Sequence, residues 1–196
     1  MKIVIIFIVL FLDLGFAQLT TYEKNAQSFE IEKVKLGCTL KSFLAIYPSA
    51  REYKSLNAEV GAKYYSVPNL RSGFVFFNRW EDASFEFCEN KLYSMSFTYY
   101  DGKASGIKNA SWAFADLLAR RMGEPKHDPS LSHLLWVFDN IKIRFDLKIY
   151  SNKDMILVIQ DDAIMDKIDE GKKKTKIVKE QRSKGKKLTN KKRGVP

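Results

Sequence analysis

Hydrophobic and polar residues alternate in several short stretches of the chain, a period of two that is typical of half-buried β-strands. The clearest stretch is 93–99, where aromatic residues and Met95 occupy every second position. The stretch 141–149 alternates in the same way without a break. The turn residues at 89–91 and 139–140 indicate antiparallel hairpins. Predicted strands cover 29–34, 73–80, 84–88, 93–99, 135–138, 141–149 and 155–160.

Two other segments have apolar residues at helical spacing. The first follows Thr39, a good N-cap residue, and is stopped by Pro48. The second ends at Met122, before a glycine and a proline, and Ser105 or Asn109 could cap its start. The apolar faces are Leu40, Phe43, Leu44 and Tyr47 in the first helix, and Phe114, Leu117, Leu118 and Met122 in the second.

The order helix, strands, helix, strands predicts an α+β fold with helices packed on an antiparallel sheet. Each helix and the strands after it form one unit, so 29–101 and 105–162 are candidate half-repeats. At 196 residues the chain is long enough for one domain with a real core. We therefore predict a single α+β domain over 18–166, built from two helix-then-strands units.

The N-terminus has the order of a secretory signal peptide. A positive start is followed by an unbroken apolar run of ten residues, 3–12, and by Gly15 and Ala17 before Gln18. A membrane anchor is the alternative, but a spanning helix needs about 20 apolar residues and Asp13 interrupts this run. We expect residues 1–17 to be cleaved and the mature protein to be exported, either periplasmic or extracellular.

Positive charge is concentrated at the C-terminus. Residues 167–196 hold 13 basic and three acidic residues, whereas 18–166 is neutral. A segment with so few apolar residues is expected to be disordered beyond about Gly171, with a transient helix as the alternative, and to attract anionic polymers or membrane surfaces. The alternatives are a nuclear import signal, which the signal peptide argues against, and a solubilising extension. Because the tail has no aromatic residues, no nucleic acid partner is expected. Candidate polyanion-binding residues are Lys172, Lys173, Lys174, Lys186, Lys187, Lys191, Lys192 and Arg193.

The two cysteines have two interpretations. In an exported protein Cys38 and Cys88 are a candidate disulfide. It would close a loop of about 50 residues and stabilise the fold by roughly 4 kcal/mol. Alternatively, both are small buried hydrophobic residues.

Few residues suggest chemistry. The sequence has no glycine-rich phosphate loop, no Cys-x-x-Cys and no recognised hydrolase motif. His127 and His133 lack the further ligands that a metal needs, and Asp161 and Asp162 are typical of a strand-ending turn. Asn109 starts a glycosylation triplet but is interpreted as a helix cap. No catalytic, metal-ligating or cofactor-binding residue is assigned, and no cofactor is expected.

Two passages resemble a known family. The segment 35–43 (KLGCTLKSF) resembles the helix start of SmpA/BamE-like domains, the outer-membrane-assembly lipoprotein type. The segment 118–125 (LARRMGEP), followed by Trp136, Val137 and Phe138, resembles the same family's passage from helix to strand. A tandem pair of such units is the architecture of the secreted β-lactamase-inhibitor proteins. The resemblance implies protein–protein binding through sheet and loop surfaces, without catalysis.

The sequence therefore favours an exported binding or inhibitor-like protein, with a sheet surface for an unknown protein partner. The polar residues Lys142, Arg144 and Lys148 on one sheet face, and part of the large aromatic content, are candidates for that surface. The sequence leaves open whether the protein is an enzyme, but it favours a protein that is not. The alternatives are a small secreted hydrolase and a structural envelope component, and the oligomeric state is not predicted.

Overall fold

The structure, a computed structural model, describes residues 21–22, 24–26, 28–73, 79–100, 104–128, 133–148 and 154–193. The predicted signal peptide and most of the predicted strand 73–80 lie outside these residues. None of the described helices combines the length and the apolar composition that a membrane crossing needs.

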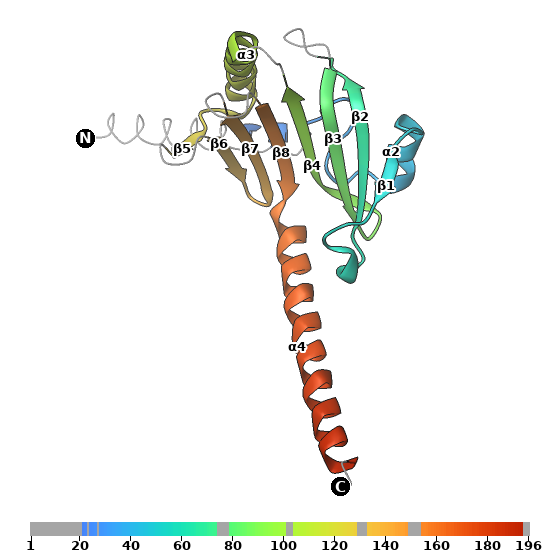
Figure 1. Ribbon diagram of the computed structural model, residues 1–196. Coiled ribbons are helices and arrows are strands. Elements are labelled where there is room, and N and C mark those ends of the chain that lie inside the picture. The colour runs from blue at the N-terminus through green and yellow to red at the C-terminus, as the bar shows by residue number, and fades with distance from the viewer. Residues whose placement is uncertain are drawn as a thin grey trace, which may run out of the picture.

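One antiparallel sheet of eight strands forms the body, in the order β1-β2-β3-β4-β8-β7-β6-β5 (Figure 1). The predicted α+β class is confirmed. The strands are β1 (Arg51–Tyr53), β2 (Lys63–Arg71), β3 (Arg79–Cys88), β4 (Lys91–Tyr100), β5 (Lys126–Asp128), β6 (His133–Phe138), β7 (Ile141–Lys148) and β8 (Asp154–Asp161).

The two halves of the body have the same element order. Helix α2 (Leu40–Ile46) precedes β1–β4, and helix α3 (Ala104–Met122) precedes β5–β8. The last strands of the two halves, β4 and β8, pair along the middle of the sheet, from Ser94 opposite Gln160 to Tyr100 opposite Asp154. The halves thus form one continuous sheet, and the predicted helix-strands-helix-strands order is confirmed.

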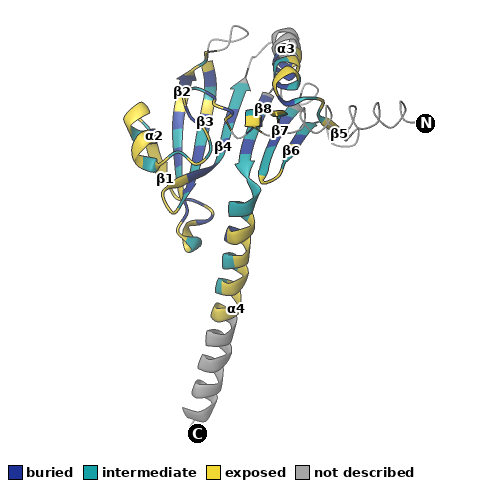
Figure 2. Ribbon diagram, turned by 180° about the vertical axis from the view of Figure 1, so that it is seen from behind, coloured by how far each residue is buried: buried dark blue, intermediate teal, exposed yellow. Residues whose placement is uncertain are grey.

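The hydrophobic core lies on one face of the sheet, under both helices. Phe43 of α2 packs on Phe85 of β3, with ring centroids 4.7 Å apart. Phe114 of α3 packs on Phe145 of β7 at 5.3 Å. Because side chains alternate between the faces of a strand, buried and half-buried residues alternate along β3, β4 and β8 (Figure 2).

The predicted strand over 29–34 is wrong. Ile31 and Val34 form an isolated bridge around a tight turn, in which Glu32 and Lys33 have φ values of 49° and 67°. Both bridge residues are 1% exposed. The apolar residues of this stretch are buried because they flank a turn that lies on the core face, and this mimics the alternation of a strand.

The start of α2 and the end of α3 are as predicted, but the predicted cap of α3 is wrong. Thr39 caps α2, because its Oγ1 accepts the N–H of Ser42 at 3.1 Å. The end of α3 is as predicted, and Gly123 follows it with a φ of 76°. Helix α3 begins at Ala104, however, so Ser105 and Asn109 lie inside it and do not cap it at the predicted positions. Both residues are only mildly unfavourable within a helix.

Sequence patterns missed the short strands β1 and β5, the 3-10 turn η1 (Ala58–Val60) and strand β2. Strand β2 contains Pro68, which cannot donate to a ladder and normally marks a strand edge. The pairing with β1 covers only Tyr64, Tyr65 and Ser66. Pro68 therefore lies where β2 has β3 on one side and none of the described strands on the other.

The prediction of a disordered tail from residue 167 is also wrong, because this segment is helical. Helix α4 (Asp162–Arg193) continues the chain directly from β8 and points away from the sheet (Figure 1). Asp161 caps it, because its Oδ1 accepts the N–H of Ile164 at 3.2 Å. Ile164, Met165 and Ile168 pack against the body in a second apolar cluster. This anchored first turn nucleates the helix, and the lysines that follow are good helix formers.

Candidate functional site

The face of the sheet opposite the core is the first candidate surface. The strand register arranges its residues in three rows that run across β2, β3, β4, β8, β7 and β6. We call these residues the open face. Its rows are Tyr64, Glu86, Ser94, Gln160, Lys142 and Val137; Ser66, Ser84, Ser96, Val158, Arg144 and Leu135; and Pro68, Asp82, Thr98, Ile156, Asp146 and His133.

The open face is accessible. Each of its residues is half-buried or exposed. Among the described residues, the cover on this side is the first turns of α4 together with η1, which pack around Tyr93 at one end of β4. The remaining length of the rows is therefore available to a partner.

The centre of the open face carries small side chains. Ser84, Ser96 and Thr98 place hydroxyl groups on β3 and β4, and Val158 and Ile156 place β-branched apolar groups beside them on β8. Such a mixture of hydroxyl and apolar groups resembles the average protein interface.

Charged groups on the open face are largely neutralised by neighbours. Lys142 Nζ lies 3.2 Å from Asp162 Oδ2, and Arg144 Nε lies 3.3 Å from Asp146 Oδ2. The Ser66 hydroxyl donates to Asp82 Oδ1 at 2.8 Å. Of the predicted polar surface residues Lys142, Arg144 and Lys148, the first two are therefore held in ion pairs. The side chain of Lys148 lies outside the described part.

Part of the aromatic content lies at one edge of this face. Tyr53 of β1 is 50% exposed and contacts Tyr64 of β2 edge-on, with ring centroids 6.2 Å apart. Trp112 is exposed on α3, away from the open face. The other tryptophans, Trp80 and Trp136, are buried in the core.

A buried polar cluster, missed by the sequence patterns, fixes the end of the open face near α4. A β-bulge opposite Glu86 and Phe87 inserts Tyr93 as an extra residue of β4. The Tyr93 phenol hydrogen-bonds Glu86 and accepts from Asn57 Nδ2 at 3.0 Å. Burial, and then the bond to Glu86, raises the pKa of Tyr93. The cluster ties the segment before η1 to the sheet.

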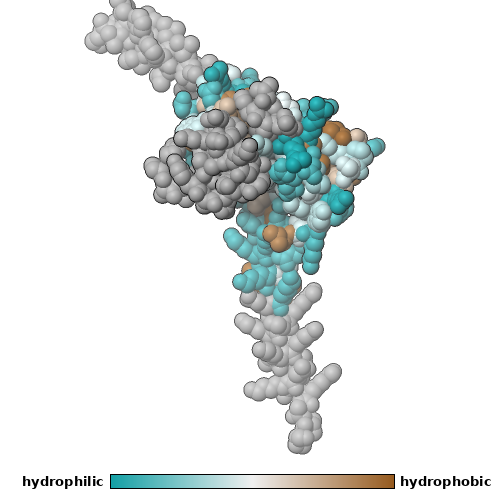
Figure 3. All heavy atoms as spheres, turned by 45° about the horizontal axis from the view of Figure 1, so that its top comes forward, coloured by the Kyte–Doolittle hydropathy of each residue, from teal (hydrophilic) through white to brown (hydrophobic). Residues whose placement is uncertain are grey.

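Helix α4 is the second candidate surface, and we call it the arm. All eight candidate polyanion-binding residues lie on it. Lys172 and Lys173 line a hollow together with Lys176, Lys179 and Glu59, three residues that were not predicted. The Lys179 ammonium donates to Glu59 and lowers the pKa of that carboxyl. The described surface around the start of the arm is mostly hydrophilic (Figure 3).

The candidate disulfide is not formed. Cys38 and Cys88 are free thiols, and Cys38 packs with the main core whereas Cys88 packs with the second cluster. Thr39 and Cys88 pair with opposite sides of Lys91. Adjacent strands are about 4.8 Å apart, so the cysteines are separated by about two strand spacings, beyond the reach of a disulfide. Burial raises the pKa of both thiols.

The histidines and the paired aspartates have structural positions. His133 Nδ1 lies 3.8 Å from Asp146 on the neighbouring strand, and His127 lies on β5, where its side chain is not described. Asp161 caps α4, and Asp162 pairs with Lys142. Within the described ranges, no group of three or more His, Cys, Asp or Glu residues could hold a metal ion.

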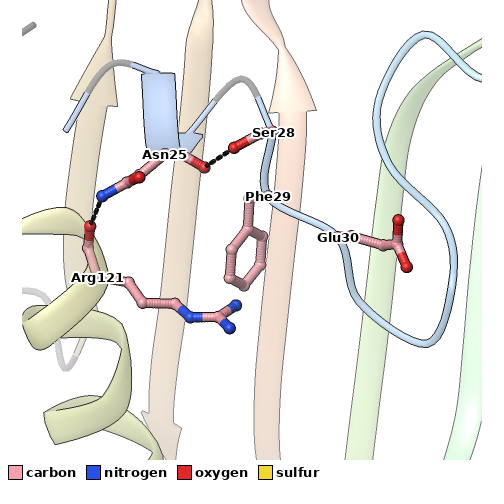
Figure 4. A pocket seen from close by; sticks show the side chains of 5 residues that line it. All are labelled: Asn25, Ser28, Phe29, Glu30 and Arg121. Atoms are coloured by element: carbon pink, nitrogen blue, oxygen red, sulfur yellow. Dashed lines mark hydrogen bonds between the residues drawn. The ribbon is translucent and has the colours of Figure 1, made fainter. Parts of the chain in front are cut away.

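A polar hollow of about 440 Å³ lies on the core side, between residues 25–30 and the end of α3. Asn25 Nδ2 donates to the Arg121 carbonyl at 2.8 Å, and the Arg121 guanidinium lies 5.9 Å from the Phe29 ring centre. Glu30 points away from Arg121 (Figure 4). The contacts around this hollow thus join the N-terminal segment to α3. Its described lining residues include no acid–base pair in contact.

No protein-family model, curated protein or solved structure matches this chain. The resemblance to SmpA/BamE-like domains and to β-lactamase-inhibitor proteins therefore stays a prediction. The candidate functions rest on the open face and the arm.

Proposed function

We propose that this protein is an exported, non-enzymatic binding protein that docks a protein partner on its open face. The arm holds the protein near an anionic surface or polymer. The observation that carries this proposal is the open face itself, three rows of accessible residues across six paired strands. With strands about 4.8 Å apart and rows about 6.8 Å apart, it spans roughly 24 Å by 14 Å.

The chemistry of the open face favours a protein over a polyanion. Its cations Lys142 and Arg144 have acidic neighbours at 3.2 Å and 3.3 Å, so little charge remains to attract a charged polymer. The apolar residues Ile156 and Val158 in the centre and Tyr53 at the edge supply the groups that protein interfaces bury.

Charge separation supports the second role. Residues 18–166 carry no net charge, whereas 167–196 carry a formal charge of +10. The arm places its cations beyond the sheet (Figure 1), so contact with a polyanion leaves the open face uncovered. A neutral docking face and a basic arm therefore suit two different partners.

The docking role is tested with two substitutions that each add one arginine. Val158→Arg changes the centre of the open face, and Ala45→Arg changes an exposed position on α2 as the matched control. Each mature protein is incubated with an extract of the source organism's envelope and secreted proteins, and captured proteins are quantified by mass spectrometry. We expect Val158→Arg to lose a protein that wild type and Ala45→Arg retain. Identical capture by all three, with unchanged melting temperatures, would refute the proposal.

A further inference from the structure

The arm carries a defined cationic groove where it crosses η1. The groove has a volume of about 310 Å³ and is lined by Lys172, Lys173, Lys176, Lys179 and Glu59. Four lysines against one glutamate give the lining a formal charge of +3. We call these five residues the lysine groove.

Two of the four lysines already have a carboxylate partner. Lys179 Nζ lies 2.8 Å from Glu59 Oε2, across 120 residues of chain, and Lys172 Nζ lies 3.5 Å from Asp169 Oδ1. Lys173 and Lys176 form no ion pair with any described residue. Glu59 is therefore an internal counterion that holds one cation of the groove, and an incoming anion competes with it.

The root of the arm holds the groove in place. Ile168 is 2% exposed in the second apolar cluster, beside Tyr93 and Val60. Gly171 lies so close to η1 that a Cβ there would come within 3.0 Å of Val60 Cγ1. Because the helix is packed against η1 just before Lys172, the groove lysines start from a fixed backbone rather than from a free tail.

The shape of the groove favours a flexible polymer over a flat membrane. At about 100° per residue, Lys172, Lys176 and Lys179 share one side of the arm, with Lys173 at its margin, and this side faces Glu59 of η1 across the hollow. A flexible chain can enter a hollow between two elements, whereas a planar surface cannot. In the part of the arm whose side chains are described, 162–179, the large exposed apolar residues are Ile177 and Val178, and they are adjacent in sequence and point in different directions, so they form no apolar stripe for lipid.

We propose that the lysine groove is a binding site for a flexible linear polymer of phosphate groups, with Glu59 as the competing internal anion. This inference rests on the function proposed above and names the partner class of the arm. The absence of aromatic residues from 167–196 leaves no platform for stacked bases. A phosphate chain without bases therefore matches the charge of the groove and needs no stacking platform.

The test uses the full mature chain and long-chain inorganic polyphosphate, with affinity measured by calorimetry over a range of salt concentrations. The groove variant is K173Q/K176Q, and the matched control K186Q/K187Q removes the same charge farther along the arm. We expect the groove variant to weaken binding about tenfold more than the control, and to lower the salt slope by about 1.4, the value for two lost phosphate contacts. We expect Glu59→Gln to tighten binding, because Lys179 is freed.

Equal losses from the groove and control variants, or unchanged affinity in Glu59→Gln, would overturn the inference. So would tighter binding to phosphatidylglycerol vesicles or to single-stranded DNA than to polyphosphate at equal phosphate concentration. A further chain has Lys176, Lys179 and all eight candidate polyanion-binding residues changed to Gln, so that it lacks both the groove cations and the candidate cations of the arm. Unchanged polyphosphate binding by that chain would refute the role of the arm itself, and not only the groove.

Discussion

Single side chains connect parts of this fold that are distant in sequence. Glu32, in the turn on the core face, accepts the indole N–H of Trp80 at 3.1 Å and the backbone N–H of Gly73 at 2.9 Å. Trp80 is fully buried. One carboxylate thus ties the N-terminal segment to the region between β2 and β3, and hydrogen bonds to a charged group are among the stronger ones in proteins.

The first prediction concerns this carboxylate. Glu32→Ala removes the acceptor of both bonds, and we expect the free energy of unfolding to fall by about 2 kcal/mol. The matched control is Glu30→Ala, an exposed position two residues earlier, for which we expect a change below about 0.5 kcal/mol. Urea denaturation of the mature protein measures both. Similar losses in the two variants would show that the bonds of Glu32 add nothing specific.

The second prediction concerns the cysteines. Cys38 and Cys88 are free and half-buried, and burial raises the pKa of both thiols. Only the thiolate reacts with maleimide, so a raised pKa lowers the reactive fraction at a given pH. We expect two labels per unfolded chain without reductant, slower labelling of the folded protein, and faster labelling as the pH rises. A chain that takes no label until it is reduced would contradict the free thiols.

At the scale of elements, the end of α3 depends on a glycine. Gly123 has a φ of 76°, and a Cβ there would lie 2.9 Å from the Tyr22 ring. Gly37 has a similar φ of 79°, but a Cβ at that position would have no atom within 4 Å, so Gly37 serves as a matched control. A left-handed backbone costs a non-glycine residue roughly 1–2 kcal/mol.

The third prediction follows from that comparison. Gly37→Ala is expected to lose only this backbone strain, about 1 kcal/mol of unfolding free energy. Gly123→Ala is expected to lose roughly 1 kcal/mol more, because overpacking against Tyr22 adds to the strain. Thermal and urea unfolding measure the difference. Equal losses would mean that the Tyr22 ring moves aside without cost.

Elements with their own local signal were predictable from sequence. The cap at Thr39, the stop at Gly123 and the alternation in β4 and β7 are read within a few residues, and each is present. Strand β2 was missed because Pro68 is tolerated only through its position beyond β1. The turn at Glu32 was mistaken for a strand because its buried residues alternate as strand residues do. The helical arm was missed because its start is stabilised by tertiary contacts of Ile168.

The candidate site was predictable only in part. The basic residues of the arm are visible in the sequence, and so is the polar side of β7. The open face as a whole is not, because it requires the pairing of β4 with β8, which joins residues about 60 positions apart. The lysine groove depends on Glu59, which lies 120 residues from Lys179. Only the fold brings these groups together.

At the scale of the whole molecule, the two faces of the sheet have different roles. One face is covered by α2, α3 and the N-terminal segment, and buries the aromatic core. The other keeps its three rows accessible, and the arm leaves the sheet at the end of β8 (Figure 1). In the proposed function, the neutral body and the basic arm are two binding surfaces on one chain that do not interfere with each other.

The most direct test of the central claim is site-specific photocrosslinking on the open face. A photoreactive residue is placed at Ser96, in the middle row, and in a second protein at Ala45, exposed on α2. Both proteins are irradiated with the source organism's envelope and secreted proteins. We predict a discrete adduct with a different protein from position 96 and none of that mass from position 45. The same adducts from both positions, or only an adduct with twice the mass of this chain, would contradict the account.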